Sequence, residues 1–190
     1  MILKGSQRSV ARQLAAHLLN SRDNEHVEVH ELRGFCADDL QGAFQEIEAT
    51  SRGTRAKQPL FSLSLNTPPR ENVSVAAFEA AIEMAERKLG LQGQPRAIVF
   101  HEKEGRRHAH AVWSRIDSEH MKAVNLPHFK RKLQDVARQL YREHGWTMPR
   151  GLVAGQQRDP LNFTRSEWEQ AKQAQQDPKA LKALFQGCWE

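Results

Sequence analysis

Phe100-His-Glu-Lys-Glu-Gly-Arg-Arg-His-Ala-His-Ala-Val-Trp-Ser-Arg115 is the stretch of this chain that best predicts its fold. It joins two predicted strands, residues 94–102 and 107–116, through a short connection that contains a glycine. Such a connection predicts an antiparallel hairpin. His108 and His110 are two positions apart, so their side chains project from one face of a strand, and His101 closes the strand across the hairpin.

Three further strands are predicted outside the hairpin. From Phe61 to Asn66 apolar and polar side chains alternate, which predicts a strand over residues 60–66, and residues 26–33 also alternate in character. Residues 1–4 form a short strand candidate, after which residues 5–8 are predicted to turn into a helix. The chain therefore has five predicted short strands, mostly antiparallel.

Helical patterns separate these strands. Apolar residues recur at helical spacing, with capping residues or glycines near the ends, in residues 9–20, 38–53, 74–90 and 127–145. Together, the elements predict an α+β fold: a five-stranded antiparallel sheet with flanking helices and a C-terminal helical extension.

The C-terminal part differs in composition from the rest. Residues 146–162 are rich in Gly, Pro and Gln and are predicted to be a linker or long loop. Thr164 to Glu167 form a capping-box pattern, and Asp177-Pro178 begins one or two more helical turns. We therefore expect a first domain at residues 1–149 and a linker with helices at 150–190, cut from a longer natural protein.

Composition excludes several classes of protein. The chain has 190 residues, of which 39% are hydrophobic, with no apolar run long enough to span a membrane. Its two cysteines, Cys36 and Cys188, form no CxxC pair, which argues against a disulfide framework or a zinc ribbon and for a reducing cytoplasm. The net charge of +5 permits a polyanionic partner.

The three hairpin histidines form a candidate metal site. Neutral imidazoles of His101, His108 and His110 can converge on one divalent cation, with Glu104 in the connection orienting a ligand. The alternative is that they are ordinary strand residues. Two other HxH patterns fail: histidine-triad hydrolases need a histidine where this chain has Val112, and cupins need a glutamate that residues 111–117 lack.

The spacing His101-x₆-His108-x-His110 resembles the three-histidine motif of conjugative relaxases, the mobilisation nucleases of the HUH endonuclease superfamily. The resemblance extends over residues 1–149 and implies a five-stranded antiparallel sheet and a bound Mn²⁺ or Mg²⁺. It also implies a nucleophile from the first helix and site- and strand-specific nicking of plasmid DNA at an origin of transfer. The enzyme would remain covalently attached to the 5′ phosphate.

The nucleophile departs from the commonest relaxase pattern. Relaxases commonly carry a tyrosine in the first helix, whereas the single tyrosine here is Tyr141 and the corresponding position holds His17. Some relaxases are similar in using a histidine, which forms a phosphoramidate. Imidazole is a competent nucleophile at neutral pH. The alternatives are that His17 and Tyr141 only pack, and that the protein binds DNA without cutting it.

Single-stranded DNA requires cations for phosphates and polar groups near the site. The predicted DNA-binding residues are Lys4, Ser6, Arg8, Arg12, Ser64, Asn66, Arg106 and Arg107. For the basic residues, the alternative is an ordinary solvated surface charge. Trp113 is predicted to lie in the core, because it belongs to the strand face opposite His108 and His110.

The resemblance also implies partners and a location. The partners would be single-stranded DNA at the origin, accessory relaxosome proteins and a type IV secretion coupling protein. The protein would act in the cytoplasm of a donor cell and move with the DNA into the recipient. Two other functions remain open: a non-catalytic single-strand DNA-binding module, and a metal-dependent phosphodiesterase that uses activated water.

Overall fold

The computed structural model describes residues 1–22, 24–69, 71–153 and 161–188. The chain divides into two compact units, Met1–Met148 and Pro149–Glu190. Each unit is described by itself below. Residues 154–160 of the predicted linker lie outside the described residues.

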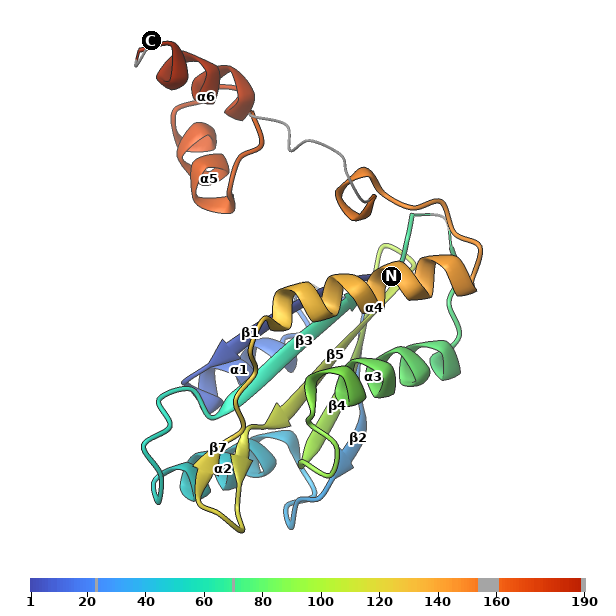
Figure 1. Ribbon diagram of the computed structural model, residues 1–190, viewed down its shortest axis with the longest axis vertical. Helices are drawn as coiled ribbons and strands as arrows, with labels where there is room; N and C mark the ends of the chain where they lie inside the picture. The colour runs from blue at the N-terminus through green and yellow to red at the C-terminus, as the bar shows by residue number, and fades with distance from the viewer. Residues whose placement is uncertain (23, 70, 154–160, 189–190) are drawn as a thin grey trace. The chain divides into compact units, whose positions relative to one another are not determined.

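The first unit is built on one five-stranded sheet. Its strands are β1 (Ile2–Arg8), β2 (His26–Arg33), β3 (Leu60–Asn66), β4 (Arg96–Lys103) and β5 (Arg106–Ser114). They lie in the order β1-β3-β5-β4-β2, and every neighbouring pair is antiparallel (Figure 1). The predicted α+β fold with a five-stranded antiparallel sheet is confirmed.

Helices cover both faces of this sheet. The helices are α1 (Ala11–Leu18), α2 (Leu40–Ser51), α3 (Val75–Leu89) and α4 (Phe129–Glu143). Helices α1 and α2 share a core with Leu60, Val99 and Val112, whereas α3 and α4 pack on the opposite sheet face. Asp39 and Ser74 cap the starts of α2 and α3 through their side chains.

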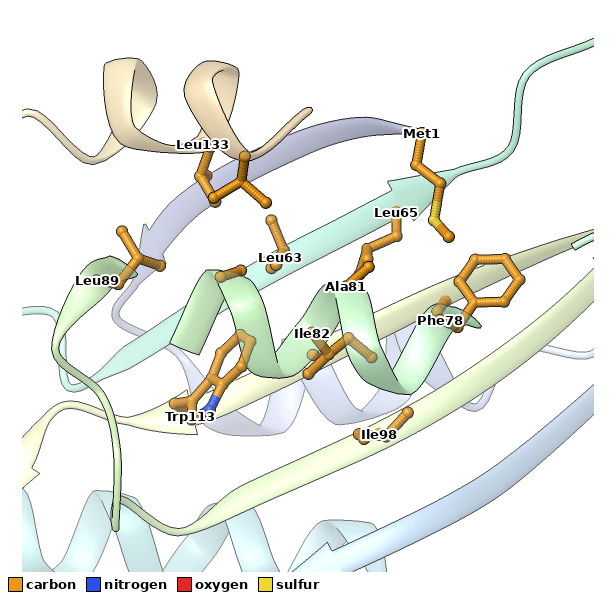
Figure 2. Close-up of a cluster of buried hydrophobic side chains, with 14 of the residues drawn as sticks. Met1, Leu63, Leu65, Phe78, Ala81, Ile82, Leu89, Ile98, Trp113 and Leu133 are labelled. Carbon is orange, nitrogen blue, oxygen red and sulfur yellow. The ribbon is translucent and has the colours of Figure 1, made fainter. Parts of the chain in front are cut away.

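The core under α3 and α4 is the larger of the two. Trp113 and Phe61 are fully buried there. Figure 2 shows Trp113 in this cluster with Leu63 and Ile82. The prediction that Trp113 is a core residue is confirmed. Since side chains alternate along β5, this placement puts the residues on either side of Trp113 on the α1 and α2 face.

The predicted turn at residues 5–8 is wrong. Strand β1 continues through Arg8, with Gly5 paired to Leu63 and Arg8 to Leu60. Pairing along the whole of β3 outweighs the local turn preference of Gly and Ser. Gly5 lies in the strand because α4 passes close above it: an added Cβ would be 2.6 Å from Leu133 Cδ1.

We expect Gly5→Val to destabilise the first unit by about 1–3 kcal/mol, the usual cost of overpacking. The new side chain would also stand 2.7 Å from Cζ of the fully buried Phe61. Urea unfolding followed by tryptophan fluorescence measures the change. Lys4→Ala, at the exposed neighbouring position, is the control and should change stability by less than about 0.5 kcal/mol.

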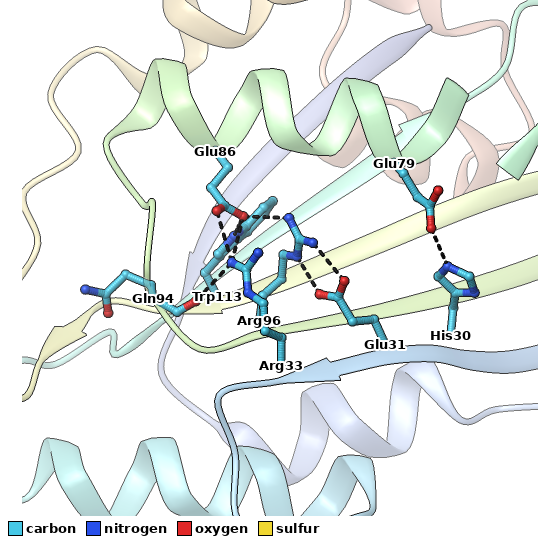
Figure 3. Close-up of polar contacts among 8 residues, drawn as sticks. All are labelled: His30, Glu31, Arg33, Glu79, Glu86, Gln94, Arg96 and Trp113. Atoms are coloured by element: carbon cyan, nitrogen blue, oxygen red, sulfur yellow. Dashed lines mark hydrogen bonds and ion pairs between the residues drawn. The ribbon is translucent and has the colours of Figure 1, made fainter. Parts of the chain in front are cut away.

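A network of ion pairs connects α3 to the sheet. The Glu86 carboxylate accepts hydrogen bonds from Arg96, Arg33 and the Trp113 indole, and Arg96 also donates to Glu31 (Figure 3). The side chains of Glu86 and Arg96 are only 8% and 5% exposed. Every buried charge in the network therefore has an opposite charge beside it.

Smaller elements complete the described chain. Two short strands, β6 (Ile116–Asp117) and β7 (Lys122–Ala123), form a hairpin that the sequence did not predict. In the second unit, a 3₁₀ turn, η1 (Arg150–Leu152), precedes α5 (Arg165–Gln173) and α6 (Pro178–Gly187). The Thr164 capping box is confirmed. No described helix is long and apolar enough to cross a membrane.

Candidate active site

The three histidines share the sheet face that α1 and α2 cover. His108 and His110 alternate with core residues of the opposite face, and His101 lies directly opposite His108 in the β4–β5 register. The ring centroids of His101 and His110 are 4.7 Å apart. The hairpin therefore gathers three imidazoles at one end of one sheet face.

The end of α1 lies against this group. Nε2 of His101, which is buried, is 2.7 Å from the backbone carbonyl oxygen of Leu18, the last residue of α1. A carbonyl oxygen only accepts hydrogen bonds, so Nε2 is the donor. This contact joins the nucleophile helix of the relaxase hypothesis to the histidine face. Nothing in the sequence indicated it.

His17 precedes Leu18 in the last turn of α1 and is exposed. It is close enough to the histidine face for its charge to lower the pKa of His101 and His110. An exposed imidazole beside this partly buried cluster is accessible to a substrate. The structure therefore brings the predicted nucleophile and the three hairpin histidines together.

The environment of the three hairpin histidines favours their neutral form. Desolvation is the largest cause of the lowered pKa of each of them, and it lowers the pKa of His110 to about 3. The charges of His101, His17 and His108 lower the pKa of His110 further. Neutral imidazole is the form that binds metal ions.

We expect the folded protein to lose stability as the pH falls below 6.5. The folded pKa of His110 is depressed, so protons bind more readily to the unfolded chain, and the stability present above pH 6.5 is lost progressively toward pH 3. At pH 5 the loss due to His110 alone is about 1–2 kcal/mol. Urea unfolding at pH 5 and pH 7 measures it.

His110→Gln should flatten this dependence, because glutamine has no proton to gain. The exposed His26→Gln variant is the matched control and should keep the full slope between pH 7 and pH 5. An unchanged slope in His110→Gln would show that this buried imidazole does not cause the acid sensitivity.

Several predicted DNA-binding residues lie in register with the histidines. Ser64 is directly opposite His110, and Asn66 is directly opposite His108. On the other edge of β3, Ser64 is paired with Lys4 of β1, and Lys4 is exposed. A row of polar side chains therefore crosses the sheet from the edge strand β1 to the imidazoles.

Three further candidates lie on β1 and at the start of α1. Ser6 and Arg8 continue the same face of β1 toward its C-terminal end, opposite Ser62 and Leu60. Arg12 is exposed in the first turn of α1. These three residues extend the polar face in the direction of the α1 start.

The arginines at the hairpin differ from each other. Arg106 is two positions from His108 on β5 and so belongs to the same sheet face, and its guanidinium donates to the backbone carbonyl of Thr67. Arg107 belongs to the opposite face, where it pairs with Glu102. A hollow of about 270 Å³ beside the turn is lined by both arginines and by residues of the loop after β3.

Glu104 lies at the tip of the hairpin turn. It has a φ of 53° and is followed by Gly105 with a φ of 66°, and the backbone N–H of Glu104 donates to Glu25. Positive φ at both central positions is typical of a tight hairpin turn. The described contacts of its exposed side chain include none with the histidines. A ligand-orienting role for Glu104 stays a prediction.

Tyr141 lies on the other side of the sheet. It is buried in α4, which packs with α3, and its ring contacts Trp146 edge to face. Burial raises the pKa of its hydroxyl. The sheet therefore separates the single tyrosine of the chain from the histidine face.

Three neutral imidazoles are suitable ligands for a divalent cation, but in this structure the three rings are not arranged around a common point. The three imidazoles are neutral, and Nδ1 of His108 is buried without a hydrogen-bond partner in the described part of the chain. Yet within that part no three His, Cys, Asp or Glu side chains are arranged to hold a metal ion. One of the three rings, that of His101, is hydrogen-bonded through Nε2 to the backbone carbonyl of Leu18.

Comparison with known protein families agrees with the geometry. A family described as relaxase, MobA/VirD2-like, nuclease domain matches residues 17–146. This span covers more than half of the chain and includes all three hairpin histidines. The protein belongs to this family of relaxase nuclease domains. No curated protein matches the chain.

Family membership defines the general activity. The domain belongs to a class of DNA-nicking enzymes that bind single-stranded DNA and typically use a divalent metal ion.

Proposed function

We propose that this protein nicks one strand of plasmid DNA at an origin of transfer and remains attached to the 5′ phosphate through His17. The observation that carries the proposal is the position of His17 in the last turn of α1, one residue before the carbonyl that contacts His101. Membership of the relaxase family supports the DNA substrate.

The reaction is a transesterification at phosphorus. A ring nitrogen of His17 attacks the scissile phosphate, the bond from phosphorus to the 3′ oxygen breaks, and that oxygen takes up a proton. The 5′ phosphate is then held as a phosphoramidate. Because the attack is reversible, the 3′ hydroxyl can restore the DNA strand.

The histidine face of the hairpin would stabilise the negative charge of the phosphate during this step. His101, His108 and His110 are the residues that would hold Mn²⁺ or Mg²⁺, which when bound supplies positive charge to the non-bridging phosphate oxygens. Desolvation lowers the pKa of each of these imidazoles, which favours their neutral, metal-binding form. Ser64 and Asn66, in direct register with two of them, supply polar contacts to the DNA backbone.

Basic side chains on the same face would guide the strand. Lys4, Arg8 and Arg12 are exposed, and Arg106 lies beside the hollow at the hairpin turn. Phosphate contacts of this kind make binding fall with rising salt. The proposal extends to accessory relaxosome proteins and a type IV secretion coupling protein as partners, on family membership alone.

The test uses the full chain, a supercoiled plasmid carrying its origin of transfer, and Mn²⁺. We expect nicked circles, and 5′ label that stays on the protein after denaturation. Cutting without labelled protein would favour hydrolysis by activated water. Binding of single-stranded DNA with no cutting would favour a non-catalytic module.

A further inference from the structure

Two segments of the first unit contain no acidic residue. Residues 1–22 and 49–70 together hold eight of the chain's 28 lysines and arginines and none of its 23 aspartates and glutamates. All other residues together therefore carry three more acidic than basic side chains. Strands β1 and β3 belong to these two segments and pair with each other along their whole length. The positive charge of the chain is therefore concentrated at this edge of the sheet and in the segments that flank it.

The segment between α2 and β3, residues 52–59, extends this charge beyond the DNA-binding residues that the sequence predicted. This 52–59 loop carries Arg52, Arg55 and Lys57, and all three side chains are exposed. Arg8, the last residue of β1, is exposed and is paired with the first residue of β3, so the loop enters the sheet beside Arg8 (Figure 1). Exposed cations therefore gather where β1 ends and β3 begins.

Hydrogen bonds from a buried arginine hold the end of this loop against β1. Arg115, which is only 8% exposed, donates to the backbone carbonyl of Gln58 at 2.7 Å and to the side-chain oxygen of Gln7 at 2.8 Å. Its second terminal nitrogen donates to the carbonyl of Val124. None of the three acceptors is a carboxylate. Arg115 therefore fixes the loop in place and adds a positive charge beside it that no carboxylate of the described residues neutralises.

Four exposed cations of this edge have no acidic partner. The described arginines that form ion pairs with carboxylates are Arg33, Arg52, Arg87, Arg96, Arg107, Arg138 and Arg165. The side chains of Arg8, Arg12, Arg55 and Lys57 form no ion pair or hydrogen bond within the part of the chain that the structure describes. Cations of this kind release condensed counterions when they contact phosphates, which favours nucleic-acid binding.

The exposed side of α1 connects these cations to the candidate active site. Arg12, Gln13, Ala16 and His17 are exposed, whereas the other side of the helix is buried. Residues three or four apart are neighbours on a helix surface, so these positions form one continuous stripe. The start of α1 follows the end of β1 closely, and its last turn lies against the hairpin histidines. The stripe therefore leads from the cations beside the 52–59 loop to His17.

We propose that the 52–59 loop binds phosphates of single-stranded DNA through Arg55 and Lys57. The strand runs from His17 along the exposed side of α1, past Arg12 and Arg8, to this loop. The inference rests on the proposed function for the DNA substrate and for the cut at His17. At about 3.4 Å per residue the two ends of β3 are about 20 Å apart, so the loop contacts phosphates several nucleotides from the cut. Phosphate contacts position the strand and carry no sequence information directly.

The double variant Arg55→Ala/Lys57→Ala tests these contacts. The full chain is titrated against a labelled oligothymidylate of about 16 nucleotides without Mn²⁺, and fluorescence anisotropy is read at several salt concentrations. The slope of log affinity against log salt should become shallower by about 1.4, which is about 0.7 for each lost phosphate contact. At about 0.1 M salt this corresponds to a roughly 10- to 30-fold weaker affinity.

Arg87→Ala/Lys88→Ala is the matched control. It removes two exposed positive charges from the last turn of α3, which packs on the opposite sheet face. Affinity should stay within about twofold of the wild type, and the salt slope should not change. Both double variants should unfold at the same urea concentration as the wild type, because their altered side chains are exposed.

The outcomes separate this inference from the nicking proposal. Unchanged affinity in Arg55→Ala/Lys57→Ala, or an equal loss in the α3 control, overturns the loop contacts and leaves the nicking proposal intact. A loss for a duplex of the same length but not for the oligothymidylate also overturns them. Absence of oligothymidylate binding by the wild type overturns both. A plasmid assay without a protein adduct, combined with the expected binding results, overturns only the role of His17.

Discussion

Replacing His17 with alanine is expected to abolish the covalent adduct between protein and DNA and to reduce nicking by about 10³-fold or more, as removal of a nucleophile does. The fold should be unaffected, because His17 is exposed and the buried residues of α1 are Ala11, Leu14, Ala15 and Leu18. The unfolding free energy of the His17→Ala variant should therefore differ from that of the wild type by less than about 0.5 kcal/mol. The measurement is the labelled plasmid assay with Mn²⁺, read on denaturing gels.

Tyr141→Phe is the control for the nucleophile. The hydroxyl of Tyr141 is buried on the far side of the sheet from the histidines, so its removal should leave nicking and the adduct unchanged. A His17→Ala protein that still forms an adduct, or a Tyr141→Phe protein that does not, would contradict the assignment.

The chemistry of the adduct gives an independent readout. A phosphoramidate is cleaved by acid, whereas a phosphotyrosine bond survives the same treatment. The wild-type adduct should therefore release its label in acid. His17→Tyr replaces the imidazole with a phenol, and any adduct that it forms should resist acid. An acid-stable wild-type adduct would show that the attacking group is not an imidazole.

The hairpin and its histidine face follow from the sequence because strand alternation leaves little freedom. Once residues 94–102 and 107–116 form a hairpin, His108 and His110 must share a face, and Trp113 must point the other way. The polar side of residues 60–66 is fixed in the same manner. Ser64 and Asn66 consequently lie opposite the two histidines of β5.

What the sequence did not reveal depends on contacts between distant segments. The continuation of β1 through Arg8 is set by pairing with β3, and the close approach of Leu133 explains the glycine at position 5. The contact of His101 with Leu18 joins positions 83 residues apart and involves a backbone carbonyl, which no residue pattern marks. Local propensity carries no information about such contacts.

The second large effect concerns Glu86, which the helical pattern did not distinguish from the other charged residues of α3. Its carboxylate accepts from Arg96 at 2.7 Å, from Arg33 at 3.0 and 3.1 Å, and from the Trp113 indole at 2.8 Å. Glu31 remains as a partner of Arg96 if Glu86 is removed, but it lies on the other side of the guanidinium and reaches different nitrogens.

We expect Glu86→Ala to destabilise the first unit by about 2–4 kcal/mol, because two buried donors, Nη1 of Arg96 and the indole N–H of Trp113, lose their acceptor while Arg96 keeps Glu31. The side chain of Arg96 is only 5% exposed, and the buried Trp113 N–H loses its acceptor. Urea unfolding at pH 7 measures the change. Because stabilities of single domains are commonly about 5–15 kcal/mol, such a loss is a large fraction of the total.

Glu79→Ala is the matched control on the same helix. Glu79 pairs with His30 at 2.8 Å, but its side chain is 45% exposed, so its removal should cost less than about 1 kcal/mol. Glu86 lies two turns further along α3, where the helix meets β4 and the fully buried indole of β5. Equal losses in the two variants would mean that the buried network stabilises α3 no more than a surface pair does, and that apolar packing on Trp113 and Ile82 holds the helix on the sheet.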